Sequence, residues 1–448
     1  MKKTLALLLA LTMCLSMAAC GGASSSSAPA SAAPADSGSA VSSTEPAGPV
    51  ELNVITSFGG DDGNRKDYEL AYKTWEAATG NTVLDGSGTY NEEFKAKILT
   101  MFETGAEPDV LYYYNGADAN KLVESGKVVS LDEIRTVYPE YGTNMKEDLM
   151  KGSCASPVDG NVYALPLIGY WENLFVNKAV LDAAGAELPG PTTTWAEFQD
   201  ICQKIKDAGY APIAASLAEI PHYWFEFCAY NHIEGNPSSH TAAPAAKGDA
   251  EEARWAAGLN DMKELYEKGY FLPNTLTCTD GDAFNEFMAG NAAFLIDGSW
   301  KMGSIADNAE NLDDFTVTYV PGQGSRKSTD VVGGLSMGFY ITKKAWDDPA
   351  KRDVAVSFVR SMTQDNVVAS YNPTAMNALA EGTPSEGRTF NSLETTALEV
   401  NAGATGIAGA AQDLVDQGPR DALFASVKDV VTGNITAEEA IETALGLS

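Results

Sequence analysis

The sequence lacks the patterns that mark most enzymes and nucleic-acid-binding proteins. It has 30 lysine and arginine residues against 61 aspartate and glutamate residues, a net charge of −31, and only three histidines. None of the six cysteines lies in a CxxC pair, so neither a zinc site nor a thioredoxin-like centre is indicated. The motifs HExxH, GxxxxGK and GxGxxG after a strand are also absent. We therefore expect a protein that binds without catalysis, uses no cofactor or metal ion, and does not bind nucleic acid.

One pattern still favours a hydrolase. Residues 334–338, Gly-Leu-Ser-Met-Gly, fit the GxSxG motif that places a nucleophilic serine on a sharp turn. In that fold the catalytic histidine follows the serine, but all three histidines precede Ser336. Acidic pairs such as Asp280 and Asp282 fit the two carboxylates of a glycosidase, yet 61 acidic residues produce such pairs by chance. A secreted hydrolase is therefore the distant alternative.

Long apolar runs are scarce, and the longest lies at the N-terminus. Lys2 and Lys3 precede an apolar stretch at residues 5–15 and small residues up to residue 19, which is typical of a secretion signal. Cys20 follows Met-Ala-Ala, a pattern that resembles the lipoprotein box of bacteria and implies a lipidated Cys20 at the new N-terminus. A plain secreted protein cleaved nearby is the alternative. No other run is long enough to span a bilayer.

The segment at residues 20–49 is too poor in apolar residues to form a core. Serine, alanine, proline and glycine dominate it, so we expect a flexible tether behind the lipid anchor. The remaining chain of about 400 residues exceeds what one core usually supports, which predicts two domains. Loss of Lys2 and Lys3 with the signal lowers the basic residues from 30 to 28, and 28 against 61 gives a mature charge of about −33.

Four cysteines remain in the body of the chain. They are Cys154, Cys202, Cys228 and Cys278. An exported location permits disulfides between them, and the sequence leaves both one or two disulfides and four buried thiols open.

Strands and helices alternate after the tether. Apolar patterns predict a strand at residues 50–58, a second strand that begins at residues 83–84, and a third that opens at residues 108–111 and runs into residues 112–115. Apolar stripes predict helices at residues 66–79 and 92–104. Strands and helices at this spacing predict a mainly parallel α/β sheet.

Residues 284–300 are the most informative segment. Phe284, Phe287 and Met288 form one apolar helix face, and residues 292–296 form a short apolar run of strand length. Turn residues then place Trp300 at the end of that strand, where open α/β sheets bind their ligands. Trp300 is therefore a candidate binding surface, and the alternative is a tryptophan packed in the core.

These segments resemble the extracellular solute-binding proteins of bacterial ABC importers, in the cluster that takes sugars. The resemblance rests on residues 284–300, on Pro-Asp-Val at residues 108–110, and on Thr-Trp-x-Glu-Phe at residues 194–198, and it covers the chain after the tether. In the last motif, Thr194 and Glu197 also predict a capping box that starts a helix.

The resemblance implies two α/β lobes, each a mainly parallel sheet flanked by helices, joined by three crossings. It places the first lobe at residues 50–168 and 322–366, the second at residues 173–316 and 371–448, and the crossings at residues 169–172, 317–321 and 367–370. It also implies closure of the lobes over one solute, docking on an ABC permease, a lipid anchor at the outer face of the membrane, and a monomer.

The expected ligand is a sugar or oligosaccharide, because stacked aromatic rings and hydroxyl-binding groups suit sugar faces and rims. The candidate stacking residues are Tyr113, Tyr170, Trp171, Trp224 and Trp300. The candidate hydroxyl partners are Asp61, Asp62, Asn115, Glu219, His222 and Asp297. Which of Tyr170 and Trp171 faces the cleft stays open. The alternative is the same transport role for a polyamine, a peptide or a phosphodiester.

Overall fold

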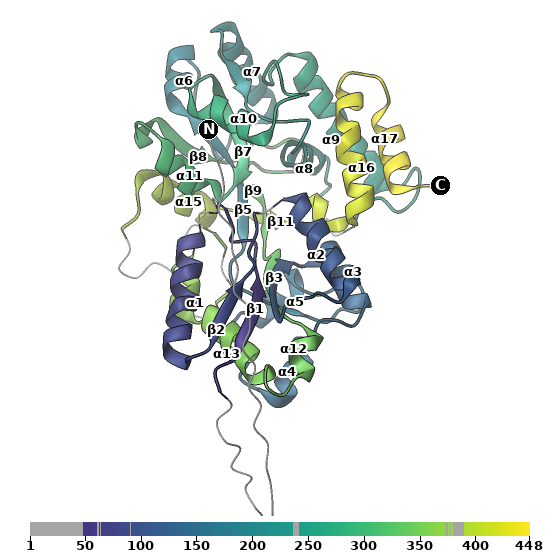
Figure 1. Cartoon of the computed structure of the whole chain (residues 1–448). Coiled ribbons are helices and arrows are strands. Elements are labelled where there is room, and N and C mark those ends of the chain that lie inside the picture. The colour runs from purple at the N-terminus through teal and green to yellow at the C-terminus, as the bar shows by residue number, and fades with distance from the viewer. Residues whose placement is uncertain are drawn as a thin grey trace, which may run out of the picture. The chain divides into compact units, whose positions relative to one another are not determined.

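The computed structural model describes residues 48–448 apart from 61, 63, 90, 236–241, 372–374, 377 and 380–388. Residues 47–448 form one compact unit, in which the strands make two separate sheets (Figure 1). The predicted signal, Cys20, most of the tether and Asp61 lie outside the described residues.

The first lobe contains a five-stranded sheet in the order β2-β1-β3-β10-β4. Its strands are β1 (Glu51–Ile55), β2 (Thr82–Asp85), β3 (Val110–Tyr114), β4 (Ala164–Pro166) and β10 (Met337–Ile341). Its helices are α1 (Arg65–Thr79), α2 (Glu92–Thr104), η1 (Gly116–Ala119), α3 (Asn120–Glu124), α4 (Leu131–Val137), α5 (Glu147–Ser153), α12 (Lys343–Asp347), α13 (Arg352–Met362) and α14 (Asp365–Val368).

The second lobe contains a six-stranded sheet in the order β11-β9-β5-β7-β6, with β8 paired to β5. Its strands are β5 (Tyr170–Asn177), β6 (Ala211–Ile213), β7 (Ala292–Gly298), β8 (Phe315–Thr318), β9 (Asp330–Gly334) and β11 (Gly406–Ala408). Its helices are α6 (Lys178–Ala184), α7 (Trp195–Asp207), α8 (His222–Tyr230), α9 (Ala250–Glu267), α10 (Asp280–Met288), α11 (Lys301–Asn308), η3 (Leu312–Asp314), α15 (Ser392–Ala402), η4 (Ala411–Leu414), α16 (Gln417–Val431) and α17 (Ala437–Leu445).

In each sheet all described strands except one run in the same direction, which agrees with the prediction, but the pairings are mixed. The first sheet has two parallel and two antiparallel pairs, and the second has two parallel and three antiparallel pairs. In the first sheet the exception is β10, which pairs antiparallel with β3 and β4. In the second it is β5, which pairs antiparallel with β7, β8 and β9. Both strands arrive from the other lobe, so each enters its sheet at the edge where the parallel strands end.

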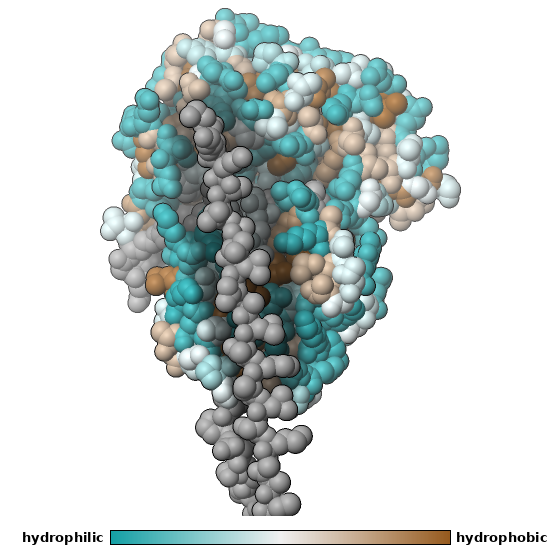
Figure 2. Space-filling model, in the orientation of Figure 1, coloured by the Kyte–Doolittle hydropathy of each residue, from teal (hydrophilic) through white to brown (hydrophobic). Residues whose placement is uncertain are grey.

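Two apolar cores lie on the two faces of each sheet, because side chains alternate along a strand. In β3, Val110 and Tyr112 belong to the core beneath α1 and α13, whereas Leu111 and Tyr113 belong to the core beneath α2. Polar residues cover much of the outer surface, as Figure 2 shows for one side. This distribution agrees with a chain that carries a net charge of −31.

The predicted helix starts are confirmed to within one residue, since α1 begins at Arg65 and α2 at Glu92. The capping box of Thr194 and Glu197 starts α7, and α10 and α17 start with the same arrangement. Helix α10 ends before Gly290, which has a positive φ of 75°, and β7 follows as predicted. None of the helices among the described residues is both long and apolar enough to cross a membrane.

The second crossing differs from the prediction. Residues 317–321 do not cross, because β8 pairs with β5 and Val320 packs in the second lobe's core. The apolar segment at residues 331–342 contains parts of two strands, of which β9 belongs to the second sheet and β10 to the first. The chain therefore crosses between the lobes at Leu335 and Ser336. Both strands are buried, so an apolar pattern continues through the change of sheet and does not reveal it.

The other crossings also shift. The chain leaves β4 at Pro166 and enters β5 at Tyr170, so the first crossing lies just before the predicted residues 169–172. The predicted third crossing at residues 367–370 is wrong, because Tyr371 and Leu379 still pack in a core of the first lobe. Leu393 of α15 packs in the second lobe, so this crossing lies between residues 379 and 393.

The structure decides between disulfides and free thiols for the four cysteines after the tether. Cys154, Cys202, Cys228 and Cys278 are all buried and form no disulfide. Burial raises the pKa of the Cys154 thiol to about 12, which keeps it protonated and unreactive.

Candidate functional site

A cavity of about 410 Å³ lies where the two sheets meet, at the ends of their parallel strands. Its volume falls within the range of small-molecule sites, and both aromatic and carboxylate side chains line it. The residues that line it are Ser57, Phe58, Gly59, Gly60, Asp62, Asn64, Thr89, Tyr112, Ile168, Gly169, Tyr170, Ile220, Tyr223, Asp280, Asp297, Trp300, Lys301, Ser304, Ser336 and Met337.

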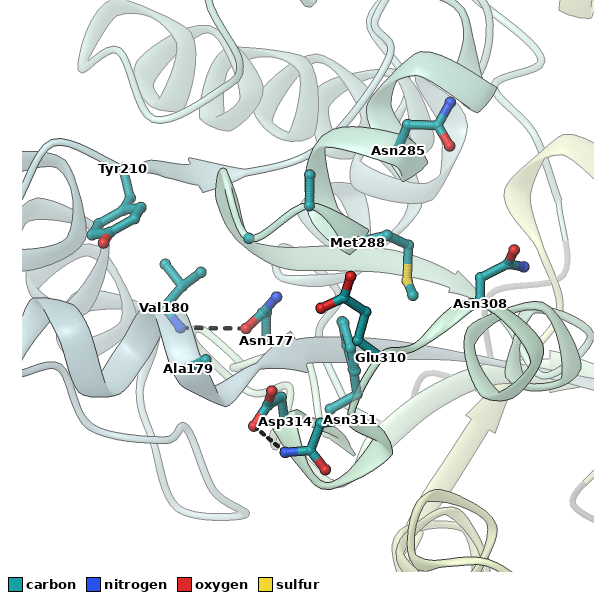
Figure 3. A pocket seen from close by; sticks show the side chains of 13 residues that line it. Asn177, Ala179, Val180, Tyr210, Asn285, Met288, Asn308, Glu310, Asn311 and Asp314 are labelled. Carbon is teal, nitrogen blue, oxygen red and sulfur yellow. Dashed lines mark hydrogen bonds between the residues drawn. The ribbon is translucent and has the colours of Figure 1, made fainter.

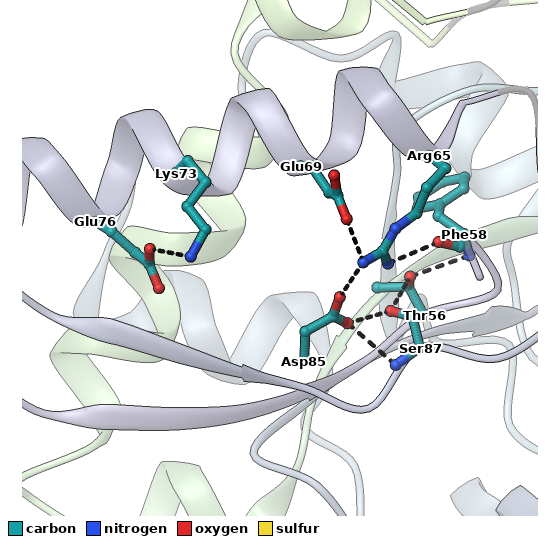
Figure 4. A network of polar contacts seen from close by, with 8 residues as sticks. All are labelled: Thr56, Phe58, Arg65, Glu69, Lys73, Glu76, Asp85 and Ser87. Atoms are coloured by element: carbon teal, nitrogen blue, oxygen red, sulfur yellow. Dashed lines mark hydrogen bonds and ion pairs between the residues drawn. The ribbon is translucent and has the colours of Figure 1, made fainter. Parts of the chain in front are cut away.

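The first lobe contributes the loop between β1 and α1. Arg65, the first residue of α1, donates from Nη1 to the Phe58 carbonyl at 2.9 Å and pairs with Asp85 at 2.8 Å, as Figure 4 shows. The Thr56 and Ser87 hydroxyls are 2.7 Å apart and tie the start of the loop to the segment after β2. Arg65 therefore connects the cavity loop to the rigid part of the sheet.

Trp300 is the central aromatic residue of the second lobe's side. It follows β7 directly and its ring lies 6.2 Å from Tyr170 and 6.4 Å from Tyr223. A Cβ atom at Gly298 would lie 2.2 Å from the Trp300 indole, so only glycine allows the indole to rest on this strand end. Trp300 and Tyr170 were both predicted as stacking residues, and both line the cavity. Of Tyr170 and Trp171, Tyr170 is the residue that lines it.

A compact ion cluster lies beside Trp300. The Lys301 Nζ atom is 3.1 Å from Asp297 and 3.3 Å from Asp280, and it sits 4.7 Å above the Phe284 ring. Burial, opposed by Lys301, raises the pKa of the Asp297 carboxyl to about 6. Burial alone would lower the pKa of Lys301, but Asp297 and Asp280 outweigh it and the pKa rises. Lys301 is therefore charged and already neutralised by its neighbours.

Asp62 supplies a further carboxylate from the first lobe. Its Oδ1 atom accepts the Asn64 backbone N–H at 2.8 Å, and burial raises the pKa of its carboxyl. Among the described residues that line the cavity, Lys301 is the one cation against three carboxylates, those of Asp62, Asp280 and Asp297. The cavity therefore has a negative charge at neutral pH.

Tyr113 does not reach the cavity. It is buried beneath α2, with its ring 6.2 Å from that of Phe94, and the residue before it in β3, Tyr112, lines the cavity instead. A shift of one residue turns a strand side chain to the opposite face, which explains this error. Trp171 differs from Tyr170 for the same reason and packs with Tyr319 in a separate core.

Asn115 has a structural role where a hydroxyl partner was expected. Its side-chain amide donates to the Leu335 carbonyl at 2.9 Å, and its backbone N–H donates to the Ser336 carbonyl at 2.7 Å. The Tyr340 hydroxyl is 3.1 Å from the Asn115 Oδ1 atom. Asn115 thus holds the second crossing against the end of β3.

Three further predicted residues lie near the cavity without lining it. Glu219 accepts the Asp280 backbone N–H at 2.7 Å and so positions the start of α10. His222 stacks on Phe424 at 5.4 Å, and burial lowers the pKa of its imidazole to about 3. Trp224 is buried in the core of the second lobe, against Phe198.

Ser336 of the GxSxG pattern does line the cavity, but its backbone differs from a nucleophile elbow. The elbow joins a strand to a helix, whereas Leu335 and Ser336 join β9 to β10. A Cβ atom at Gly169 would lie 2.2 Å from the Gly334 carbonyl oxygen. Gly169, which lies outside the pattern, therefore lets the two crossing segments pass closely.

Sequence reasoning missed Phe58, Tyr112, Tyr223 and Lys301 as cavity residues. Tyr223 lies between the two predicted residues His222 and Trp224, and the alternation of side chains along a strand was the signal that separates Tyr112 from Tyr113. Lys301 is adjacent to Trp300 at the start of α11. Asp297 lies only four residues earlier, but the contact with Asp280 of α10 depends on how the segment folds.

A second concavity lies in the second lobe, at the opposite end of β7 from Trp300. Asn177, Asn308, Glu310, Asn311 and Asp314 line it, as Figure 3 shows. The Asn177 Oδ1 atom accepts the Val180 backbone N–H at 3.3 Å, and the Asn311 amide donates to Asp314 at 2.9 Å. Several of its polar groups therefore serve the local turns.

No group of three or more metal-ligating side chains exists among the described residues.

Two buried glutamates form a pair: Glu172 belongs to β5 and Glu226 to α8. Burial and the neighbouring Glu226 raise the pKa of Glu172 well above its usual range, and burial raises the pKa of Glu226 to about 8. Glu226 accepts the Gln412 backbone N–H at 3.2 Å. The pair therefore holds a proton at neutral pH.

Comparison with known proteins agrees with this arrangement. Residues 71–382 match the family model described as bacterial extracellular solute-binding protein. The chain is 24% identical over 304 residues to the sn-glycerol-3-phosphate-binding periplasmic protein UgpB of Rhizobium meliloti (strain 1021), covering 66% of this chain and 68% of that protein. It is 25% identical over 302 residues to the maltooligosaccharide ABC transporter solute-binding lipoprotein of Streptococcus pneumoniae (strain ATCC BAA-255 / R6), covering 64% and 62%.

Solved structures share the fold. A chitin oligosaccharide binding protein superimposes with a TM-score of 0.75 at 21% identity, over 89% of this chain and 98% of that one. The maltose/maltodextrin-binding domain of Bdellovibrio bacteriovorus bound to maltotriose gives a TM-score of 0.65 at 17% identity, over 88% and 97%. These structures have the two-lobed periplasmic-binding-protein fold. With its family match over most of its length, the chain belongs to the bacterial extracellular solute-binding proteins.

Proposed function

We propose that this protein captures a neutral sugar or oligosaccharide outside the cell and delivers it to an ABC permease. The observation that carries the proposal is the cavity itself, in which Trp300, Tyr170 and Tyr223 lie beside the carboxylates of Asp62, Asp280 and Asp297. Aromatic faces suit the C–H faces of sugar rings, and carboxylates accept hydrogen bonds from sugar hydroxyls. The relatives named for maltooligosaccharide and chitin oligosaccharide support this ligand class.

The charge of the cavity separates this proposal from a phosphate-bearing ligand. A site for sn-glycerol 3-phosphate, the ligand in the name of one relative, needs cationic or N–H donors for the phosphate. The cavity's described cation, Lys301, is already paired with Asp297 and Asp280. A phosphate would therefore meet an excess of negative charge, so a neutral solute fits better. Polyamines and peptides remain the alternatives that the binding experiment distinguishes.

The experiment is a binding screen on the protein from Ala47 onward, which forms a compact unit of its own. Tryptophan fluorescence and calorimetry would be measured with chitin oligosaccharides, maltotriose, raffinose and galactose, and with sn-glycerol 3-phosphate, spermidine and a tripeptide for comparison. We expect saturable binding of one of the sugars. Binding of the phosphate ester, the polyamine or the peptide alone would refute a sugar ligand.

Two variants test the site directly. Trp300→Ala removes the central ring and should weaken sugar binding by about five-fold or more, since stacking on an aromatic face contributes roughly 1 kcal/mol or more. Trp171→Phe is the matched control, because Trp171 packs outside the cavity and should leave the affinity unchanged. Equal affinity in Trp300→Ala and the control would remove Trp300 from the site.

We also propose that the protein acts without catalysis as a monomer held at the outer face of the membrane through a lipid on Cys20. The lipoprotein-box pattern before Cys20 and the tether composition of residues 20–49 support the anchor. Replacement of Cys20 by alanine should move the protein from the membrane fraction to the medium, as measured by immunoblotting of the two fractions. Retention of the Cys20→Ala variant in the membrane would contradict a lipid anchor at this residue.

A further inference from the structure

The two lobes also meet through a cluster of charged side chains that does not line the cavity. Asp118 lies in η1 of the first lobe, and its carboxylate binds Lys95 of α2 in the same lobe at 3.0 Å. The same carboxylate binds Arg420 of α16 in the second lobe at 2.9 Å. The side chains of Lys95, Asp118 and Arg420 are 4%, 3% and 2% exposed. One buried carboxylate therefore joins a cation from each lobe.

Neighbouring contacts show that this is an extended meeting of two segments. The Asn120 amide of α3 donates to Asp416, the residue before α16, at 3.2 Å. Segments η1 and η4 pack against each other, and Gly116 lies against the Asp413 backbone. Lys95 is held in place by the ring of Tyr114, which lies 4.2 Å from its Nζ atom. The cluster thus sits at the centre of a contact between the lobes.

The charges in this contact depend on Asp118. Asp413 also faces the cluster, and burial together with Asp118 raises the pKa of its carboxyl to about 7. The nearby His222 is neutral, since burial and the charges of Lys95 and Arg420 lower its pKa to about 3. Loss of Asp118 would remove the carboxylate that Lys95 and Arg420 share across the lobe boundary.

We propose that Lys95, Asp118 and Arg420 form an interlobe clasp that favours the closed arrangement of the lobes and thereby sets the affinity for the ligand. The bond between Asp118 and Arg420 exists only while the two lobes are together at this contact. A ligand held between lobes binds in proportion to the population of the closed form, so a change in that population changes the apparent affinity. The predicted change in ligand affinity rests on the proposed function, whereas the predicted change in the population of the closed form does not.

The variants have unequal expected effects, which makes the clasp testable. Asp118→Asn leaves Lys95 and Arg420 as two buried cations that share an uncharged amide, and it should strongly disfavour closure, because like charges are costly when buried. Arg420→Met removes the second lobe's cation but leaves the pair of Lys95 and Asp118 intact within the first lobe. Its effect on closure should therefore be the smaller of the two. Glu140→Gln is the matched control, because it breaks an exposed pair with Arg360 within the first lobe.

The measurement is the distance between two spin labels in the ligand-free protein from Ala47 onward. Cysteines introduced at the exposed residues Glu103 of α2 and Glu438 of α17 would carry the labels, and the four native cysteines of the body are buried. We expect Asp118→Asn to shift the distribution to longer distances and to lower the closed-to-open ratio about ten-fold or more. Arg420→Met should shift it less, and the control should match the parent protein.

Each outcome decides the proposal. Unchanged distributions in folded Asp118→Asn and Arg420→Met would overturn the clasp, as would a shift of equal size in the Glu140→Gln control. If Asp118→Asn does not fold, Arg420→Met and Asn120→Ala, which breaks the bond to Asp416, provide the decision by the same measurement. The ligand-free distances test the clasp even if no sugar binds, so failure of the sugar proposal is recognised separately in the binding screen.

Discussion

Gly298 is the residue on which the position of Trp300 depends. A Cβ atom there would lie 2.2 Å from the indole, so Gly298→Ala forces the ring away from its place beside Tyr170 and Tyr223. We expect the affinity for the sugar to fall at least about ten-fold while the protein stays folded. Gly303→Ala is the control, because a Cβ at this position in α11 meets nothing within 4 Å and alanine favours a helix. Calorimetric titration measures both, and equal affinities would contradict the role of Gly298.

Glu172 and Glu226 make stability depend on pH in a defined direction. The folded protein keeps a proton on this pair up to a pKa of about 8 for Glu226, whereas an unfolded glutamate releases it near 4.5. Between these values the unfolded state binds fewer protons, so the free energy of unfolding falls as the pH rises. Glu172→Gln should flatten this decline between pH 5 and pH 8, as followed by thermal melting. Glu442→Gln, at a partly exposed ion pair with Lys247, should leave the decline unchanged. A parent protein more stable at pH 8 than at pH 5 would refute this account.

At the scale of an element, α1 positions the cavity loop through its first residue. Arg65 bonds the Phe58 carbonyl, Asp85 and Glu69, so Arg65→Met should loosen residues 57–60 and weaken ligand binding. One to two lost hydrogen bonds correspond to about 1–3 kcal/mol, or a loss of affinity of roughly five-fold or more. Lys73→Met on the same helix removes an exposed pair with Glu76 and a contact with the Tyr72 ring, both away from the cavity loop, and serves as the control. Titration of both variants with the sugar identified in the screen measures the difference. An Arg65→Met variant with the affinity of the control would show that the loop needs no anchor.

At the scale of the whole molecule, the excess of acidic residues repels itself. With 30 basic against 61 acidic residues, the folded chain should become more stable as salt screens the repulsion. We expect the melting temperature to rise between about 0.01 M and 0.1 M salt, over which the Debye length falls from about 30 Å to about 10 Å. Sodium chloride and choline chloride should act equally, since the effect is one of screening. A rise with sodium alone would indicate a bound ion instead.

The local sequence determined most of the elements and the central aromatic residue. Helix α2 has its predicted bounds, the capping box of Thr194 and Glu197 starts α7, and the segment from α10 to Trp300 has the predicted order of helix, strand and turn. These features depend on side-chain periodicity and on hydrogen bonds within a few residues, which a sequence displays directly.

The tertiary structure alone decided which side chains meet. Tyr112 and Tyr113 differ only in the sheet face they occupy, β9 and β10 share one apolar pattern but belong to different sheets, and Asp118 meets Arg420 across 302 positions of the chain. Local sequence patterns indicate whether a side chain is buried, but not which other side chains it packs against. The contact between the lobes arises where distant segments converge, so its chemistry appears only once the chain is folded.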